Sequence, residues 1–223
     1  RLPKESCTYL EGRCLHFGGA MPYLPILDIV KSYFDIDEED REYLIKKKVR
    51  ERLIRLDGKF LASLPSIHEI LSVPVEDEKY LQIDPQQRRQ RIFEAIRDLL
   101  LRESQVKPLL LAVEDLHWID KTSRDFLDYL IGWMANSRIL LVLLYRPEFT
   151  HSWGSKSYYT QIGLGQLSNR TSAELVQAIL EKGEVVPELK ELILGRAGGN
   201  PLFVEELTHS LVENGSIRRE DAH

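Results

Sequence analysis

The sequence has few cysteines and no long apolar segment. Its two cysteines, Cys7 and Cys14, fit no metal-binding spacing, and one pair does not make a disulfide framework, so a reducing, cytoplasmic setting is expected. The longest apolar run, residues 139–145, is far too short to span a bilayer, and no signal peptide is visible. We therefore expect no membrane partner. Because the sequence begins with Arg1 rather than Met, we also expect it to be part of a longer protein.

The sequence also lacks a concentration of positive charge. It has 30 Lys and Arg residues against 35 Asp and Glu residues, and its formal net charge is −5. The short run Lys46-Lys47-Lys48 lies in a segment of mixed charge, which favours a solvated helix face over a binding patch. Since a nucleic-acid footprint needs Lys and Arg clustered on one face, no nucleic-acid partner is evident.

Motifs of several common enzyme classes are missing as well. No G-x-S-x-G nucleophile elbow is present, and the two cysteines lack a redox spacing. His117 has no Cys or His partner at a spacing that would make a zinc site, so a structural role is favoured for it. The three tryptophans, Trp118, Trp133 and Trp153, are too scattered to predict a stacking platform.

What the sequence does contain is a strand–helix–strand pattern. The runs LLLAV (109–113) and ILLVLLY (139–145) are continuously apolar, as is typical of strands buried on both faces of a parallel sheet. Between them lies an amphipathic segment whose helix would be capped by Asp120 or Thr122. We expect the two strands to be parallel, and either adjacent or separated by one strand.

The rest of the pattern adds one strand and several helices. Residues 7–17 favour a strand that ends at Gly18-Gly19, and residues 60–83 favour short helices and loops. The other expected helices are one introduced by Pro22 and Pro25, then 38–57, one opened by Asp84-Pro85, 171–182, 187–195 and 201–214.

The change of pattern predicts two parts. Residues 1–165 read as an α/β part with a helical insertion at about 38–83, and residues 166–223 read as a helical part. Neither internal repeats nor low-complexity tracts interrupt them.

Two adjacent acids follow the first apolar run. Glu114 and Asp115 stand at the carboxyl end of a strand, which is where ligands bind in open parallel sheets. Two carboxylates at a strand end repel each other, and a divalent cation with its waters would relieve that repulsion. The second carboxylate could then orient an attacking water. The alternative is simply that the strand ends and polar residues begin.

Two further features could belong to the same site. Arg146 ends the second apolar run and could touch a terminal phosphate, or it could be a surface salt-bridge residue. Gly198, Gly199, Asn200 and Pro201 precede a helix and could form a lid element resting on an adenine, or a plain turn between two helices.

Residues 109–130, LLLAVEDLHWIDKTSRDFLDYL, resemble the second nucleotide-binding motif of the signal-transduction ATPases with numerous domains, a branch of the AAA+-like P-loop proteins. Within that branch they look most like the modules attached to bacterial class III adenylate/guanylate cyclases, some serine/threonine kinases and some LuxR-type regulators. Four other segments resemble family motifs in the expected order. They are GRCLHFGGAMPYLPILDIV (12–30), DPQQRRQRIFEAIRDLLL (84–101), LLYRPEF (143–149) and GGNPLFVEELTHSLVENG (198–215).

The resemblance implies a role for each candidate residue. Glu114 would be the magnesium-side acid and Asp115 the water-polarising acid, with Arg146 as the sensor arginine. Gly199 and Pro201 would flank the adenine of ATP, with Asn200 between them. The implied fold is a P-loop NTPase-type core (1–165) followed by a helical lid (166–223), and the implied ligands are ATP or ADP and Mg²⁺.

One departure from the family is large. Its phosphate loop, G-x-x-x-x-G-K-[ST], is absent from these 223 residues, since Gly12, Gly18 and Gly19 are not followed by Lys-Ser or Lys-Thr. That loop supplies the backbone cradle and the lysine that bind phosphates. We therefore expect a core without its first strand and phosphate loop. Alone it would be inactive, and its parent protein would be an ATPase switch that acts on an effector domain of the same chain. The alternative is a non-catalytic regulatory or interaction module that keeps the fold and binds no nucleotide.

Overall fold

The computed structural model describes residues 6–16, 22–180 and 185–216, and the chain divides into two compact units. The first unit ends at Tyr159 and the second begins at Thr160. Each unit has a hydrophobic core of its own. The identification of the two units as ATPase core and lid stays a prediction.

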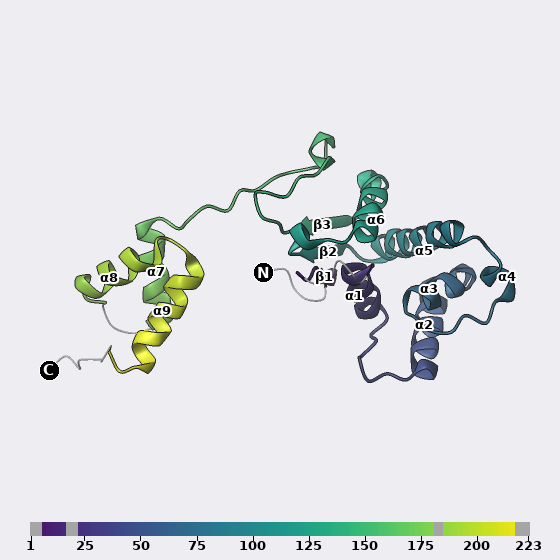
Figure 1. Cartoon of the computed structure of the whole chain (residues 1–223), viewed down its shortest axis with the longest axis horizontal. Helices are drawn as coiled ribbons and strands as arrows, with labels where there is room; N and C mark the ends of the chain where they lie inside the picture. The colour runs from purple at the N-terminus through teal and green to yellow at the C-terminus, as the bar shows by residue number, and fades with distance from the viewer. Residues whose placement is uncertain (1–5, 17–21, 181–184, 217–223) are drawn as a thin grey trace. The chain divides into compact units, whose positions relative to one another are not determined.

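The first unit combines a small sheet with helices (Figure 1). Its strands are β1 (Thr8–Arg13), β2 (Leu109–Glu114) and β3 (Ile139–Leu143). Its helices are α1 (Leu24–Tyr33), α2 (Glu42–Leu56), α3 (Leu64–Ile70), α4 (Glu78–Leu81), α5 (Pro85–Val106) and α6 (Lys121–Ile131), with short 3-10 turns such as η2 (Gly58–Ser63) and η3 (Leu116–Trp118) between them.

The sheet is parallel throughout and has the order β1-β2-β3. In register, Leu10 of β1 lies opposite Leu111 of β2, which lies opposite Leu141 of β3. The prediction of an α/β fold with a parallel sheet is confirmed, and β2 and β3 are adjacent as expected. All three strands point their carboxyl ends toward the same edge, so residues that follow them are brought close together.

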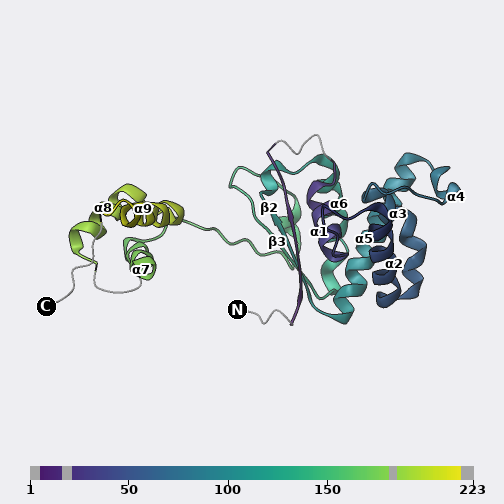
Figure 2. The same ribbon diagram turned by 90° about the horizontal axis from the view of Figure 1, so that it is seen from below.

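Helices α1 and α6 cover one face of this sheet, which Figure 2 shows. The residues facing them, such as Leu10, Leu111 and Val113, are buried. The prediction that β3 is buried on both faces is wrong. On its other face Leu140 and Val142 are 58% and 37% exposed, because β3 is an edge strand of the described sheet and no described helix of this unit covers that face.

Several element boundaries follow from single side chains. Asp84 accepts hydrogen bonds from the backbone N–H groups of Gln86 and Gln87, and Pro85 occupies the first turn, so α5 begins where the sequence predicted. Asp120, rather than Thr122, caps α6 by accepting from the Ser123 backbone N–H at 2.9 Å.

Other boundaries differ from the prediction. Helix α2 begins at Glu42 rather than residue 38, because Asp40 holds a turn by accepting from the Asp37 backbone N–H and pairing with Lys48. Strand β1 was predicted to run to residue 17 but ends at Arg13, where its partner β2 also ends. Residue 17 and the predicted terminator Gly18-Gly19 lie outside the described residues. Strand β3 likewise ends at Leu143 instead of Tyr145, because β2 turns away after Glu114.

A buried carboxylate anchors the amino end of the sheet. Glu103, near the end of α5, is 6% exposed and accepts a hydrogen bond from the Tyr33 hydroxyl at 2.9 Å. Arg52 of α2 approaches the same carboxylate at 3.5 Å, and the Thr8 hydroxyl of β1 donates to it at 3.4 Å. Burial raises the pKa of Tyr33, which keeps that hydroxyl protonated as a donor. These contacts tie α1, α2, α5 and β1 together.

The second unit contains α7 (Asn169–Leu180), α8 (Pro187–Ala197) and α9 (Pro201–Glu213). Its core consists of five buried apolar residues on or beside these helices: Val176, Val185, Ile193, Ala197 and Val204. The sequence predicted three helices here, and residues 181–182 of the first predicted helix lie outside the described residues. Among the residues that the structure describes, no helix of either unit has the length and apolarity needed to cross a membrane.

The close approach of α1 to β1 generates one prediction. A Cβ atom added at Gly12 would lie 2.0 Å from the Pro25 carbonyl oxygen, which is rigid backbone. We expect Gly12→Ala to destabilise the fold by about 1–3 kcal/mol through overpacking. Gly58→Ala is the matched control, because nothing lies within 4 Å of the added carbon. Urea unfolding of both variants measures the difference, and equal midpoints would contradict it.

The exposed face of β3 generates a second prediction. Leu111 is 1% exposed, whereas Leu140 is 58% exposed. We expect Leu111→Ala to lower the free energy of unfolding by about 2–5 kcal/mol, because it leaves a cavity in the core. The same truncation at Leu140 should cost less than about 1 kcal/mol. Thermal or denaturant unfolding compares the two, and a larger loss at Leu140 would mean that this face is covered in solution.

Candidate functional site

The predicted acid pair lies at the carboxyl edge of the sheet. Glu114 is the last residue of β2, and Asp115 follows in a left-handed backbone conformation with φ 54° and ψ 37°. Residues with a Cβ rarely adopt this conformation, although Asp tolerates it better than most. Backbone bonds hold the turn: Leu116 N–H donates to the Leu144 carbonyl at 2.9 Å, and Trp118 N–H donates to the Asp115 carbonyl at 2.9 Å. The turn therefore breaks the strand direction between the two acids.

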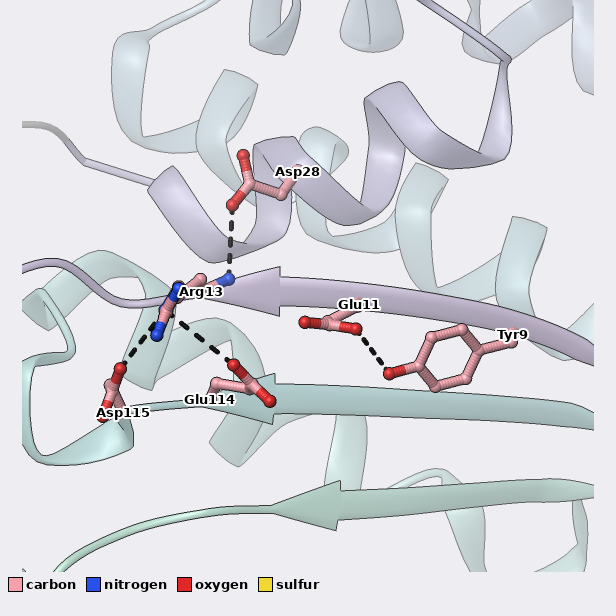
Figure 3. Close-up of polar contacts among 6 residues, drawn as sticks. All are labelled: Tyr9, Glu11, Arg13, Asp28, Glu114 and Asp115. Carbon is pink, nitrogen blue, oxygen red and sulfur yellow. Dashed lines mark hydrogen bonds and ion pairs between the residues drawn. The ribbon is translucent and has the colours of Figure 1, made fainter. Parts of the chain in front are cut away.

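Arg13, which the sequence analysis missed, joins the two acids. It is the last residue of β1 and stands opposite Glu114 in the parallel register. Its Nε lies 3.3 Å from Asp115 Oδ2 and 3.8 Å from Glu114 Oε2. Figure 3 shows the guanidinium between the two carboxylates. The only sequence signal for this contact was that the strands at 7–17 and 109–113 could be neighbours in one parallel sheet.

Further acidic groups surround this edge. The Arg13 backbone N–H donates to Asp28 Oδ2 of α1 at 3.2 Å, which fixes the end of β1. Asp120 accepts from the Tyr23 backbone N–H at 3.4 Å as well as capping α6. Burial, and then the negative charges of Asp120, Asp115 and Asp28, raise the pKa of the Cys14 thiol to about 12. Cys14 is therefore a buried thiol without nucleophilic character at neutral pH.

The ring of Trp118 contacts one residue that follows each of the three strands. His16, after β1, meets its ring edge-on with centroids 5.2 Å apart. His117, its neighbour after β2, lies at 4.4 Å. The Arg146 guanidinium, after β3, lies 5.6 Å from the centre of the same ring. The Trp118 ring thus contacts residues from all three strand ends at the carboxyl edge of the sheet, which the spacing of the tryptophans in the sequence did not predict.

Arg146 is placed differently from the two acids. Its side chain is exposed and lies over Trp118, whereas the ion pairs of Glu114 and Asp115 among the described residues are with Arg13. The structure therefore puts Arg146 at the predicted edge through an aromatic contact. Its sensor role stays a prediction.

Two polar groups beside the acids are buried without a hydrogen-bond partner in the described part of the chain. They are the ring of His117, at both nitrogens, and Asp120 Oδ2. The sequence favoured a structural role for His117, and its contact with Trp118 agrees with that role. The unpaired nitrogens have no explanation in the structure.

The Gly-Gly-Asn-Pro segment forms the turn between α8 and α9. Gly198 has φ 56° and ends α8, and Gly199 has φ 76°. A Cβ at Gly199 would lie 2.6 Å from the Leu167 carbonyl oxygen, so a side chain has no room there. Asn200 caps α9 by accepting from the Leu202 backbone N–H at 3.0 Å, with Pro201 in the first turn. Local geometry thus accounts for all four residues, and contact with adenine stays a prediction.

A cavity of about 240 Å³ lies in the first unit, at the edge of the sheet opposite to the acid pair. Its walls come from the end of α5 and from the segment before β3, which is the amino edge of the sheet. The lining residues are Leu101, Ser104, Gln105, Trp133, Asn136, Ser137 and Arg138. No titratable acid lines it, so its chemistry does not resemble that of the acid pair.

The acid pair fits a magnesium ion that is brought by a phosphate ligand. Magnesium takes one or two protein carboxylates and fills its remaining positions with water and phosphate oxygens. Glu114 and Asp115 supply two carboxylates whose side chains are 36% and 31% exposed, so both are accessible. Within the described ranges, no group of three or more His, Cys, Asp or Glu residues could hold a metal ion. The two carboxylates therefore leave most positions of the metal to water and phosphate oxygens, and without a nucleotide they would hold a cation only weakly.

Comparison with known proteins identifies the first unit. Residues 1–142 match the family described as AAA ATPase domain, and residues 168–223 match a domain of unknown function (DUF8739). An uncharacterized protein of Rhizobium meliloti (strain 1021) is 30% identical over 133 residues. That match covers 59% of this chain and 13% of the relative, so the chain corresponds to a small part of that protein. No solved structure matches.

The family match, the parallel sheet and the order of the motifs agree. The match covers well over half of the chain and includes the whole of β2 with its acid pair. Nucleotide binding on a P-loop-like core is the property that this family carries. The chain belongs to the AAA ATPase domain family.

Proposed function

We propose that this chain is part of an ATP-binding and ATP-hydrolysing switch in a multidomain signalling protein. The observation that carries the proposal is the acid pair at the end of β2, with Asp115 in a left-handed conformation beside Glu114 at the carboxyl edge. Backbone strain of this kind is concentrated at functional sites. The resemblance of residues 109–130 favours the cyclase-, kinase- or LuxR-associated branch of the family as the setting.

Each candidate residue has a role in this proposal. Glu114 and Asp115 would hold Mg²⁺, directly or through waters, and Asp115 would also orient the water that attacks the terminal phosphate. Arg146, held against Trp118, contacts that phosphate and so distinguishes ATP from ADP. Gly199, Asn200 and Pro201 form the adenine-facing turn of the lid. Bound Mg²⁺ supplies charge neutralisation of the phosphates.

The phosphate cradle is proposed to come from outside residues 1–223, because no G-x-x-x-x-G-K-[ST] motif occurs within them. The edge of β3 that pairs with no other described strand supports this proposal, because a further strand could hydrogen-bond there and extend the sheet.

Partners and setting follow from the same proposal. ATP and ADP are the ligands, and the output is an effector domain on the same chain whose activity changes when the lid and core respond to the nucleotide. A cytoplasmic setting is supported by the two free cysteines, Cys7 and Cys14.

A non-catalytic regulatory module is the second candidate function. Arg13 favours it, because its guanidinium already offsets part of the negative charge of the acid pair without a metal ion. A module of this kind would keep the fold and use the exposed face of β3 to contact another protein. The two candidates differ in whether a version of the protein that contains a phosphate loop binds ATP.

Mutation of the acids tests the first candidate. In a longer protein that includes a phosphate loop, we expect Asp115→Asn to retain ATP binding and to lower turnover by at least about a hundredfold, because it removes the charge that orients water. Glu114→Gln should weaken the dependence of ATP binding on Mg²⁺. Calorimetry measures binding, and phosphate release measures turnover.

The 223-residue chain serves as the companion sample. Loss of three charge-assisted hydrogen bonds from the loop costs about 4 kcal/mol, so its affinity for ATP should be roughly a thousandfold lower. Glu148→Gln is the control for the two acid variants, since it removes one exposed carboxylate that follows β3. Micromolar ATP binding by the 223-residue chain, or full turnover by Asp115→Asn, would contradict the assignment.

A further inference from the structure

Arg13 is a charged residue at the functional edge that the proposed roles do not use. Its position is set by the sheet, because β1 pairs with β2 in parallel and both strands end at the same level. The Arg13 backbone is held on both sides: its N–H donates to Asp28 Oδ2, and the next N–H, of Cys14, donates to the Glu114 carbonyl at 3.0 Å. The backbone is therefore fixed, whereas the side chain extends from it toward the acids (Figure 3).

The guanidinium of Arg13 reduces the repulsion between the two carboxylates, as a metal ion would. Glu114 and Asp115 are adjacent carboxylates that repel each other. One Nε atom lies within 4 Å of an oxygen of each, at 3.8 Å and 3.3 Å. A single positive charge thus lies within ion-pair distance of both negative charges and offsets part of their mutual repulsion.

The contact is also weak enough to be exchanged. The Arg13 side chain is 61% exposed, and both acids are about one-third exposed. Exposed ion pairs of this kind contribute little to stability, because water screens them and a long side chain must be ordered. A divalent cation carries twice the charge in a smaller volume, and it would repel a guanidinium held between the same carboxylates.

We propose that Arg13 is a displaceable counter-ion of the acid pair, which occupies the cation position when no metal–nucleotide complex is bound and is expelled when one binds. This inference rests on the proposed function, because it assumes that Glu114 and Asp115 receive the divalent cation. It makes Arg13 a positioning residue that keeps the two carboxylates together in the empty site. When the metal–nucleotide complex binds, the charged side chain of Arg13 at the end of β1 therefore moves away from the acids.

The test measures divalent-cation affinity in the absence of nucleotide. Mn²⁺ is the probe, and its free concentration is followed by electron paramagnetic resonance in solutions of the 223-residue chain. We expect Arg13→Gln to bind Mn²⁺ about three- to tenfold more tightly than the unmodified chain, because the competing charge is gone. Arg13→Lys keeps a charge at the site and should stay near the unmodified affinity.

Two controls accompany these variants. Lys47→Gln removes an equal charge from an exposed pair with Glu51 on α2 and should leave Mn²⁺ affinity unchanged. Asp115→Asn should weaken binding by at least about tenfold, because it removes one ligand of the two. Circular dichroism verifies that each variant is folded, and Arg13→Met, which also removes the charge, serves if Arg13→Gln is not folded.

A second readout reports on the guanidinium itself. In the unmodified chain, the Nε–H resonance of Arg13 should shift as Mg²⁺ is added, along the same saturation curve as the metal occupancy. If Arg13 only stabilised the end of β1, its Nε–H resonance would not follow the metal occupancy.

The outcomes separate this inference from the proposed function. If Asp115→Asn weakens Mn²⁺ binding but Arg13→Gln leaves it unchanged or weakens it, the counter-ion role of Arg13 is overturned and the acid pair remains the metal site. If neither Asp115→Asn nor Glu114→Gln alters Mn²⁺ binding, the metal assignment fails and the inference fails with it. Tighter binding by Arg13→Gln together with weaker binding by Asp115→Asn supports both.

Discussion

The parallel hydrogen-bond ladder that β2 makes with β1 and β3 is the interaction on which the rest of the first unit depends. Strand β2 lies between two strands that are distant from it in sequence, and its pairing with them sets the carboxyl ends of all three strands at one edge. Without that alignment, Arg13 would not face Glu114, and the turn after β2 would lack the Leu144 carbonyl that accepts from Leu116. The positions of Arg13, Glu114 and Asp115 are therefore a consequence of backbone pairing.

At this edge of the sheet the candidate site combines opposite charges with one aromatic side chain, Trp118. Arg13 pairs with both acids, and Trp118 contacts Arg146 and two histidines. Asp115 occupies a left-handed conformation, so its side chain leaves the strand direction that Glu114 follows. Exposed ion pairs of this kind contribute little to stability, so the proposed exchange of Arg13 for a metal cation would cost little free energy.

Some of this was predictable from the sequence, because it depends on neighbours along the chain. Asp84 and Pro85 start α5, and Asp120 starts α6, since a cap needs only residues one turn away. The apolar run LLLAV and the acids after it were also recognisable. The burial of β3 was predicted wrongly. An unbroken apolar run has the same appearance whether one face or both faces of its strand are covered, and only the layers packed on the sheet distinguish the two cases.

By itself, then, the sequence determined the order of the main elements, the start of α5, the parallel sheet and the acid pair, because hydrophobic periodicity and capping act over a few residues. The tertiary structure alone decided which residues meet across long separations. Arg13 and Asp115 are 102 positions apart, and Gly12 approaches the Pro25 carbonyl only because α1 packs onto β1. Such contacts leave no local pattern, since they arise from register and packing, and register is fixed only when the whole sheet has formed.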